Sequence, residues 1–191
     1  SAVGHDYISS KVIPGASAPS KRLRIELSNL ASGGGHGMIL GGARTGRTQA
    51  ARAAVTVSGR TPVELCATEL NAEDEAQLFA SMDQPATTII LRDVQDLTPA
   101  IQQRLSSCLN NGAAATVMCT ATPSLVQASL DGGFERELFL RLSQSEVRVP
   151  SLAARRADLV QWIDHLHLAR TPDHGGSTSR GPLQFTGEGI E

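Results

Sequence analysis

The chain has 191 residues, of which 40% are hydrophobic and 19% are charged, and its formal net charge is -2. This length and apolar content suit one globular unit with a sizeable core, and the slightly acidic balance excludes a strongly basic surface that would attract nucleic acid. Since no apolar run is long enough to cross a bilayer and no secretory signal is visible, we expect a cytoplasmic location without membrane contact.

Cysteine usage points to a reducing compartment. Cys66, Cys108 and Cys119 all lie in apolar runs, and the chain contains no Cys-x-x-Cys pair. This pattern favours packed, reduced thiols over metal ligands. His36 lies in the glycine-rich stretch 33–37, where a solvated loop residue is the simplest expectation.

Strand-like and helix-like patterns alternate along the chain. Residues 1–20 are rich in Ser, Gly, Pro and Ala, which predicts a flexible N-terminal segment. Expected helices cover residues 21–31, 48–57, 72–82, 98–109, 134–142 and 155–169. Expected strands cover residues 38–40, 62–66, 87–91, 115–121 and 145–150.

Several of these helices carry specific signals. Thr98 is an expected N-cap, and Pro99 suits the first helical position that follows it. The expected core positions of the first and third helices are Leu23, Leu27, Leu30, Leu78, Phe79 and Met82. One face of the last helix carries Leu159, Trp162, Ile163 and Leu166.

The alternation predicts an α/β fold in which helices cover a parallel sheet. Ligands of such sheets bind at the carboxyl ends of the strands. The string GGARTGRT, from Gly41 to Thr48, lies at that position between an expected strand and an expected helix. Its Gly-x-x-x-x-Gly spacing and the positive end of the helix favour phosphate binding, although a glycine-rich turn without a ligand stays an alternative.

The residues expected to bind the phosphate groups are Gly41, Gly42, Arg44, Thr45, Gly46, Arg47 and Thr48. Arg47 stands where a phosphate loop has lysine, so the charge is kept on a longer, forked side chain. Thr48 stands where a hydroxyl binds magnesium. Arg44 is a bulky residue inside the loop that could cover the phosphates or block them.

The order of several strings resembles one known family. GGARTGRT stands in register with GESGTGKE, and LRDVQDLTPAIQQRLSSCL at 91–109 resembles LDEIGELPLALQAKLLRVL. FERELFLRL at 134–142 resembles FREDLYYRL, and PSLAARRADL at 150–159 resembles PPLRERREDI. These strings belong to the AAA+ domain of bacterial enhancer-binding, NtrC-like transcription activators, which act on the sigma-54 form of RNA polymerase.

The resemblance implies a P-loop NTPase of the AAA+ class, a three-layer sandwich with a parallel sheet and a truncated C-terminal helical lid. We expect residues 21–170 to form the core domain and residues 171–191 to form a linker and the start of the lid. ATP or ADP is the implied cofactor. The implied partners are further copies of the chain and other domains of a transcription regulator, without direct nucleic-acid contact by this part.

The sequence departs from the family at the magnesium motif. The family has Asp, which organises magnesium, followed by Glu, which positions the attacking water; here Arg92 and Asp93 stand there. A cation beside the metal site opposes magnesium binding, and Asp93 is one methylene shorter than Glu. If the register slips so that Asp93 serves the metal, Val94 replaces the second acid. Strand alternation predicts that Arg92 and Asp93 point to opposite faces.

Other catalytic parts are incomplete. The family's sensor Asn corresponds to Pro123 or its neighbour, and proline has no side-chain amide. Of two family arginines that act across a subunit boundary, the first is replaced by Glu135 and the second is kept as Arg141. We expect Asp93 and Arg141 to be the remaining catalytic candidates, with a solvated helix arginine as the alternative for Arg141.

The family's sigma-contact motif GAFTGA occurs nowhere in the chain. We therefore expect a degenerate regulatory module that binds ATP or ADP weakly and hydrolyses it little or not at all. An active ATPase with a rearranged metal site and a nucleotide-free interaction scaffold are the alternatives.

Overall fold

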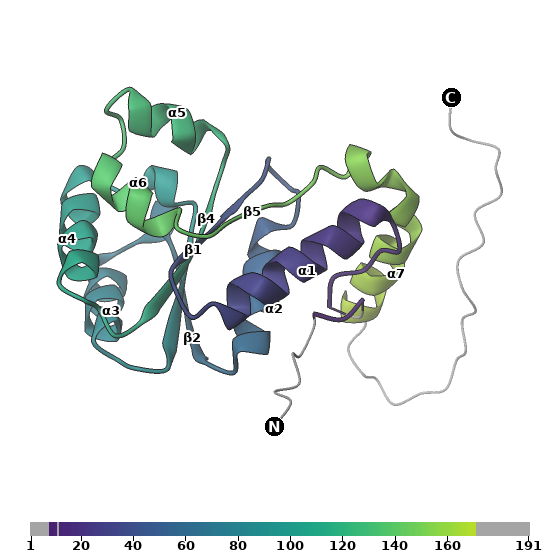
Figure 1. The fold of residues 1–191 in the computed structure, drawn as a ribbon, viewed down its shortest axis with the longest axis horizontal. Coiled ribbons are helices and arrows are strands. Elements are labelled where there is room, and N and C mark those ends of the chain that lie inside the picture. Colours follow the sequence, from purple (N-terminus) through teal and green to yellow (C-terminus); the bar gives the residue numbers. More distant parts are fainter. Residues whose placement is uncertain (1–7, 11, 171–191) are drawn as a thin grey trace.

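The computed structural model describes residues 8–10 and 12–170 and shows a five-stranded parallel sheet with strand order β2-β3-β4-β1-β5 (Figure 1). The strands are β1 (Gly37–Leu40), β2 (Thr61–Cys66), β3 (Thr87–Arg92), β4 (Thr116–Ala121) and β5 (Glu146–Arg148). The α-helices are α1 (Ala18–Ser32), α2 (Arg47–Ser58), α3 (Ala72–Met82), α4 (Pro99–Asn110), α5 (Ser124–Leu130), α6 (Arg136–Leu142) and α7 (Leu159–Arg170). Three short 3-10 helices are η1 (Ala67–Glu69), η2 (Val94–Asp96) and η3 (Ala153–Asp158).

Helices cover both faces of the sheet, as the predicted three-layer sandwich requires. Met38 and Leu40 of β1 pack into the core shared with α3 to α6, whereas Ile39 packs into the core shared with α1 and α2. Figure 1 shows these two helical layers on opposite sides of the strands. Because successive strand residues point to opposite faces, apolar runs buried on both sides are typical of such a parallel sheet.

The helix signals in the sequence are confirmed. All six predicted core residues of α1 and α3 are at most 9% exposed. Burial of each such side chain contributes roughly 1.5–3 kcal/mol. Thr98 caps α4 through a hydrogen bond from the Ile101 amide, and Pro99 is the first residue of that helix.

The N-terminal region is more ordered than its composition predicts. Helix α1 begins at Ala18, three residues before the expected start, because the Ser17 side chain accepts a hydrogen bond from the Ser20 amide. Ile8 and Ile13 are 3% and 1% exposed, so this segment packs on the α1–α2 layer. Residues 1–7 lie outside the described residues, as does the expected linker from 171.

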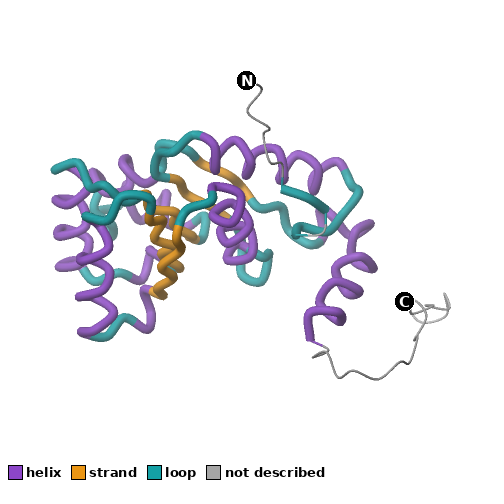
Figure 2. Tube along the Cα trace, turned by 90° about the horizontal axis from the view of Figure 1, so that it is seen from below, coloured by secondary structure: helices purple, strands orange, loops and turns teal. Residues whose placement is uncertain are grey.

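Two further elements differ from expectation. Helix α5 was not predicted, and α7 begins at Leu159, four residues later than expected, because Arg155 (φ -129°, ψ 34°) interrupts the preceding turn. Figure 2 shows α7 extending beyond the sheet. No helix in the described ranges has the length and apolarity to cross a membrane.

Candidate functional site

The glycine-rich loop joins the carboxyl end of β1 to the start of α2, as predicted. Gly46 has a φ of 90° and is the N-cap of α2, and the Gly41 amide donates to the Ala121 carbonyl on β4 at 3.2 Å. A Cβ at Gly41 would lie 2.6 Å from Thr45 Oγ1, so any larger residue there would displace the Thr45 side chain. The first amides of α2 are therefore presented at the edge of the sheet where phosphate groups bind in this loop type.

Arg44 is strained within this loop. Its φ is 59°, in the left-handed region that a non-glycine residue rarely adopts, and its side chain is exposed. Such strain costs on the order of 1–3 kcal/mol and is found preferentially at functional sites. Thr45, which follows it, is 7% exposed, and its hydroxyl donates to the Gly42 carbonyl at 2.9 Å.

Arg47 contacts the acid that follows β3. Its Nη2 lies 2.8 Å from Asp93 Oδ1, and its Nη1 donates to the Gly41 carbonyl at 3.0 Å. The side chains of Arg47 and Asp93 are 14% and 30% exposed. The structure therefore brings together two predicted site residues that are 46 positions apart in the sequence, and they neutralise each other at the loop.

Arg92 lies on the other side of the strand end. Its guanidinium forms ion pairs with Glu64 at 3.3 Å and with Glu69 at 3.8 Å, near the edge strand β2. Asp93 leaves the strand in the left-handed region (φ 54°), and its amide donates to Thr120 Oγ1 at 3.1 Å. Arg92 and Asp93 therefore pair with different partners, and the charge of Arg92 is compensated by Glu64 and Glu69 rather than by Asp93.

Glu64 is the acid that compensates Arg92. It also accepts two hydrogen bonds of 2.7 Å from Arg52 on α2. The hydrogen bonds from Arg52 lower the pKa of Glu64, the charges of Arg52 and Arg92 lower it further, and partial burial opposes them. The Glu64 carboxylate is thus held ionised by Arg52 and Arg92, and both arginines use it as their ion-pair partner.

Arg141 lies far from these residues. Its Nε donates to Asn110 Oδ1 at 2.9 Å, and its side chain is exposed on α6. Burial lowers the pKa of His36, and the charge of Arg141 lowers it further. His36 comes just before β1, and the phosphate loop comes just after β1. Because Arg141 lies near His36, it lies toward the end of the sheet opposite the phosphate loop.

His36 itself is not a solvated loop residue, contrary to the expectation from its glycine-rich surroundings. Its Nδ1 accepts a hydrogen bond from the Val117 amide on β4 at 3.1 Å, and the residue is partly buried. The ring thus satisfies a backbone donor at the start of a central strand. The flanking glycines hid this role, because the contact joins residues 81 positions apart.

Arg155 is a residue of this region for which the sequence predicts no role. It is 2% exposed, its Nη2 donates to the Thr45 carbonyl, and its guanidinium carbon lies 5.0 Å from the ring centroid of Trp162. Burial lowers its pKa, and the charge of Asp158 opposes that effect. In the sequence, the string that contains it, PSLAARRADL, carries only the resemblance to the family.

A cleft separates the phosphate loop from α7. It encloses about 410 Å³, and its apolar wall includes Leu152, Leu159 and Ile163, which are 39–42% exposed. Arg44, Gln49 and Trp162 border the same space. Three residues of the predicted apolar face of α7, Leu159, Trp162 and Ile163, therefore line this cleft, and the side chain of Leu166 lies outside the described residues.

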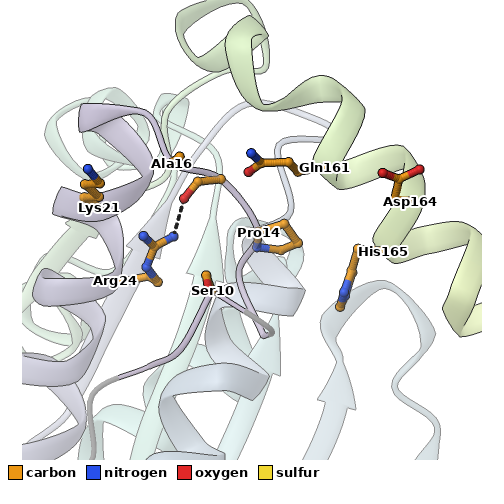
Figure 3. Close-up of a pocket in the computed structure, with 9 residues that line it drawn as sticks. Ser10, Pro14, Ala16, Lys21, Arg24, Gln161, Asp164 and His165 are labelled. Carbon is orange, nitrogen blue, oxygen red and sulfur yellow. Dashed lines mark hydrogen bonds between the residues drawn. The ribbon is translucent and has the colours of Figure 1, made fainter. Parts of the chain in front are cut away.

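A larger cavity, of about 720 Å³, lies between the N-terminal segment, α1 and α7 (Figure 3). Lys21 and Arg24 line it from α1, and Asp164 and His165 line it from α7. Arg24 donates to the Gly15 carbonyl at 2.8 Å, which ties α1 to the segment before it. None of its lining residues belongs to the phosphate loop, so its size does not make it the phosphate site.

The residues present fit phosphate groups better than a metal ion. Gly46 turns the chain so that the first amides of α2 face the loop, Arg44 adds an exposed positive charge, and Arg47 adds a second charge that Asp93 shares. For magnesium, Thr48 offers a hydroxyl, but the Asp93 carboxylate is engaged by Arg47. The described residues contain no group of three or more His, Cys, Asp or Glu side chains placed to hold a metal.

The free cysteines do not change this conclusion. Cys119 is fully buried on β4, and burial raises the pKa of its thiol to about 12. Cys66 and Cys108 are free and partly buried. A thiol with a pKa this high is protonated at neutral pH and is a poor metal ligand or nucleophile.

Comparisons with solved structures agree with the fold. NtrX from Brucella abortus in complex with ATP superposes with a TM-score of 0.69 and 23% identity, and the match covers 80% of this chain and 41% of NtrX. NtrX in complex with ADP gives a TM-score of 0.71 and 22% identity, with coverage of 79% and 40%. The RuvB Holliday junction branch migration motor from Thermotoga maritima gives 0.58 and 14%, with coverage of 81% and 51%.

The chain therefore spans about two fifths of the length of NtrX. Among curated proteins, no match was found. A family model described as the sigma-54 interaction domain matches residues 14–152, which is well over half of the chain. By this match the chain belongs to the sigma-54 interaction domain family, and its α/β fold is that of the P-loop AAA+ NTPases.

Proposed function

We propose that this domain is a degenerate nucleotide-binding module of a sigma-54 activator-type transcription regulator. It binds ATP or ADP weakly through the loop from Gly41 to Thr48 and hydrolyses ATP little or not at all. Its nucleotide state then serves assembly or signal integration in the regulator rather than remodelling of the polymerase. The absence of a GAFTGA string from the sequence supports the last part of this proposal.

Nucleotide binding is supported by the loop geometry. Gly46 adopts the left-handed conformation that turns the chain into α2, and the amides of Arg47 and Thr48 follow at the positive end of that helix. NtrX, which shares the fold, has been solved in complex with ATP and in complex with ADP. In this chain the phosphates are proposed to meet the loop amides, Arg47 and, at the rim, Arg44.

Impaired hydrolysis rests on one observation, the ion pair of Arg47 with Asp93 at 2.8 Å. Asp93 is the acid that would either organise magnesium or position water, and a carboxylate already neutralised by a guanidinium does both poorly. The next residue, Val94, is fully buried and has no carboxylate. Asp96 accepts a hydrogen bond from Gln95 at 2.9 Å and does not take over this position.

The same pair suggests how the domain binds nucleotide without much help from a metal. Guanidinium groups of Arg47 and Arg44 compensate phosphate charge that magnesium otherwise balances. If magnesium enters, the Thr48 hydroxyl is its proposed ligand. We therefore expect magnesium to change ATP affinity only slightly.

Calorimetric titration of ATP, with and without magnesium, tests the proposal. We expect a dissociation constant in the micromolar to millimolar range that changes less than threefold with magnesium, and at least tenfold weaker binding by Arg47→Ala. Arg52→Ala is the matched control, because Arg52 lies on the same helix and is paired with Glu64. Binding that needs magnesium, or that survives Arg47→Ala unchanged, contradicts the proposal.

A nucleotide-free interaction scaffold is the second candidate. It is favoured by the fact that Arg47 is satisfied by Asp93 and by the Gly41 carbonyl without any ligand. The same titration decides, since absence of heat up to millimolar ATP supports the scaffold. In either case we propose that Arg141, exposed on α6, faces a neighbouring copy or domain.

A further inference from the structure

Arg155 contacts two elements that lie far apart in the sequence, the phosphate loop and α7. Its Nη2 donates to the carbonyl of Thr45 in the phosphate loop, 110 positions away in the sequence. The central carbon of the Arg155 guanidinium lies 5.0 Å from the centroid of the Trp162 ring on α7, within the range of a cation–π contact. One buried side chain therefore contacts both walls of the cleft.

This arrangement has a free-energy cost. Arg155 is 2% exposed, yet its Nε and Nη1 have no hydrogen-bond acceptor among the described residues. Trp162 Nε1 is also buried without an acceptor. Because buried donors without acceptors are unfavourable, a small displacement of either wall can change which contacts are most stable.

The loop contact is placed where a phosphate acts on it. The peptide group between Thr45 and Gly46 is planar and trans, so its carbonyl and its N–H point in opposite directions. The carbonyl faces Arg155, and the Gly46 N–H consequently points away from Arg155. A phosphate that attracts this N–H reorients the same peptide plane and hence the acceptor that holds Arg155.

We propose that Arg155 is a positioning residue that couples the phosphate loop to α7, so that phosphate binding to the loop changes the environment of Trp162. This inference rests on the proposed nucleotide binding, and it adds a structural change around Trp162 by which binding is transmitted to α7. Next to Arg155, Asp158 anchors the start of α1 through hydrogen bonds from the Ala16 and Ser17 amides at 3.0 and 2.9 Å. The turn that precedes α7 is thus anchored at Asp158, and the proposed response lies in α7.

The chain itself supplies the probe, because Trp162 is its one tryptophan. Emission of Trp162, excited at a wavelength that spares tyrosine, is followed while ATP is added, and binding is measured separately by calorimetry. The variant is Arg155→Ala. The control is Arg156→Ala, which removes the exposed neighbouring arginine and leaves the Arg155 contacts in place.

We expect ATP to change the Trp162 emission of the wild-type protein and of Arg156→Ala by the same amount. In Arg155→Ala the emission change is lost, whereas the calorimetric affinity stays within about threefold. A base that touched Trp162 directly would still change its emission in this variant. An unchanged response in Arg155→Ala, or wild-type binding without any emission change, overturns the coupling.

Hydrogen exchange of the ligand-free protein tests the coupling independently of nucleotide. Trp162→Ala is expected to raise amide exchange in the loop, residues 41–48, at least threefold, with Arg156→Ala unchanged and exchange in β3 as the folding control. Loop exchange unaffected by Trp162→Ala overturns the coupling. If calorimetry detects no ATP binding, the proposed function fails, and the exchange result still decides the role of Arg155.

Discussion

At the scale of single residues, Asp93 competes with any bound phosphate for the guanidinium of Arg47. Replacement by Asp93→Asn removes the charge that holds Arg47 and leaves the loop geometry in place. We expect ATP to bind about fivefold more tightly, which corresponds to about 1 kcal/mol for a partly exposed ion pair, without a gain in hydrolysis. Calorimetry checks this result, with Asp96→Asn as the control, and weaker binding by Asp93→Asn would show that the carboxylate assists the ligand.

Gly41 gives a second prediction at this scale. In Gly41→Ala the new Cβ would lie 2.6 Å from Thr45 Oγ1 and 3.0 Å from Arg47 Cγ, so the loop must shift. We expect ATP binding to weaken at least tenfold and the melting temperature to fall by several degrees, since overpacking costs about 1–3 kcal/mol. Gly35→Ala is the control, because no atom lies within 4 Å of its added Cβ; equal effects of both substitutions would refute the argument.

At the scale of elements, Asp158 ties the end of η3 to the start of α1. The carboxylate is 1% exposed and accepts hydrogen bonds from the amides of Ala16 and Ser17 and from the hydroxyls of Ser17 and Ser20. Burial raises the pKa of Asp158, but these hydrogen bonds outweigh it and the net pKa lies below 3.8. We expect Asp158→Asn to lose about 2–3 kcal/mol of unfolding free energy at pH 7.

The direction of the pKa shift of Asp158 determines how that loss of stability depends on pH. Because the folded-state pKa is lowered, the contribution of Asp158 is fully present well above pH 3.8 and is lost as the pH falls through the folded-state value. Urea denaturation at pH 7 and near pH 3 should therefore show a difference between wild type and Asp158→Asn that shrinks in acid. Asp164→Asn, on the neighbouring helix, serves as control, and a difference that grows in acid would contradict the assignment.

The elements themselves were largely predictable, for a physical reason. Apolar runs such as residues 87–91 and leucines at helical spacing indicate local burial, and each pattern can be read within a short window of the sequence. Contacts between distant residues are absent from such patterns. The pairing of Arg92 with Glu64 depends on the register of β3 against β2, and the contact of Arg155 with Thr45 depends on how η3 meets the loop.

At the scale of the whole molecule, the domain keeps the AAA+ scaffold, and we propose that its catalytic parts have changed. The sheet, the loop position and the family match over residues 14–152 are those of a sigma-54 interaction domain. The proposed loss of hydrolysis rests on the pairing of Asp93, after β3, with Arg47, and the position of Pro123 after β4 agrees with it. Such a domain can still respond to nucleotide, because binding and hydrolysis use different groups.

The most direct test of this account is the fate of ATP during a long incubation with the protein. The protein is incubated with ATP and magnesium for hours, the nucleotides of the whole mixture are analysed by chromatography, and binding is measured in parallel by calorimetry. We predict that the ATP stays intact although the wild-type protein binds it at least tenfold more tightly than Arg47→Ala does. Recovery of ADP with stoichiometric or greater phosphate release would contradict the account and establish an active ATPase with a rearranged metal site.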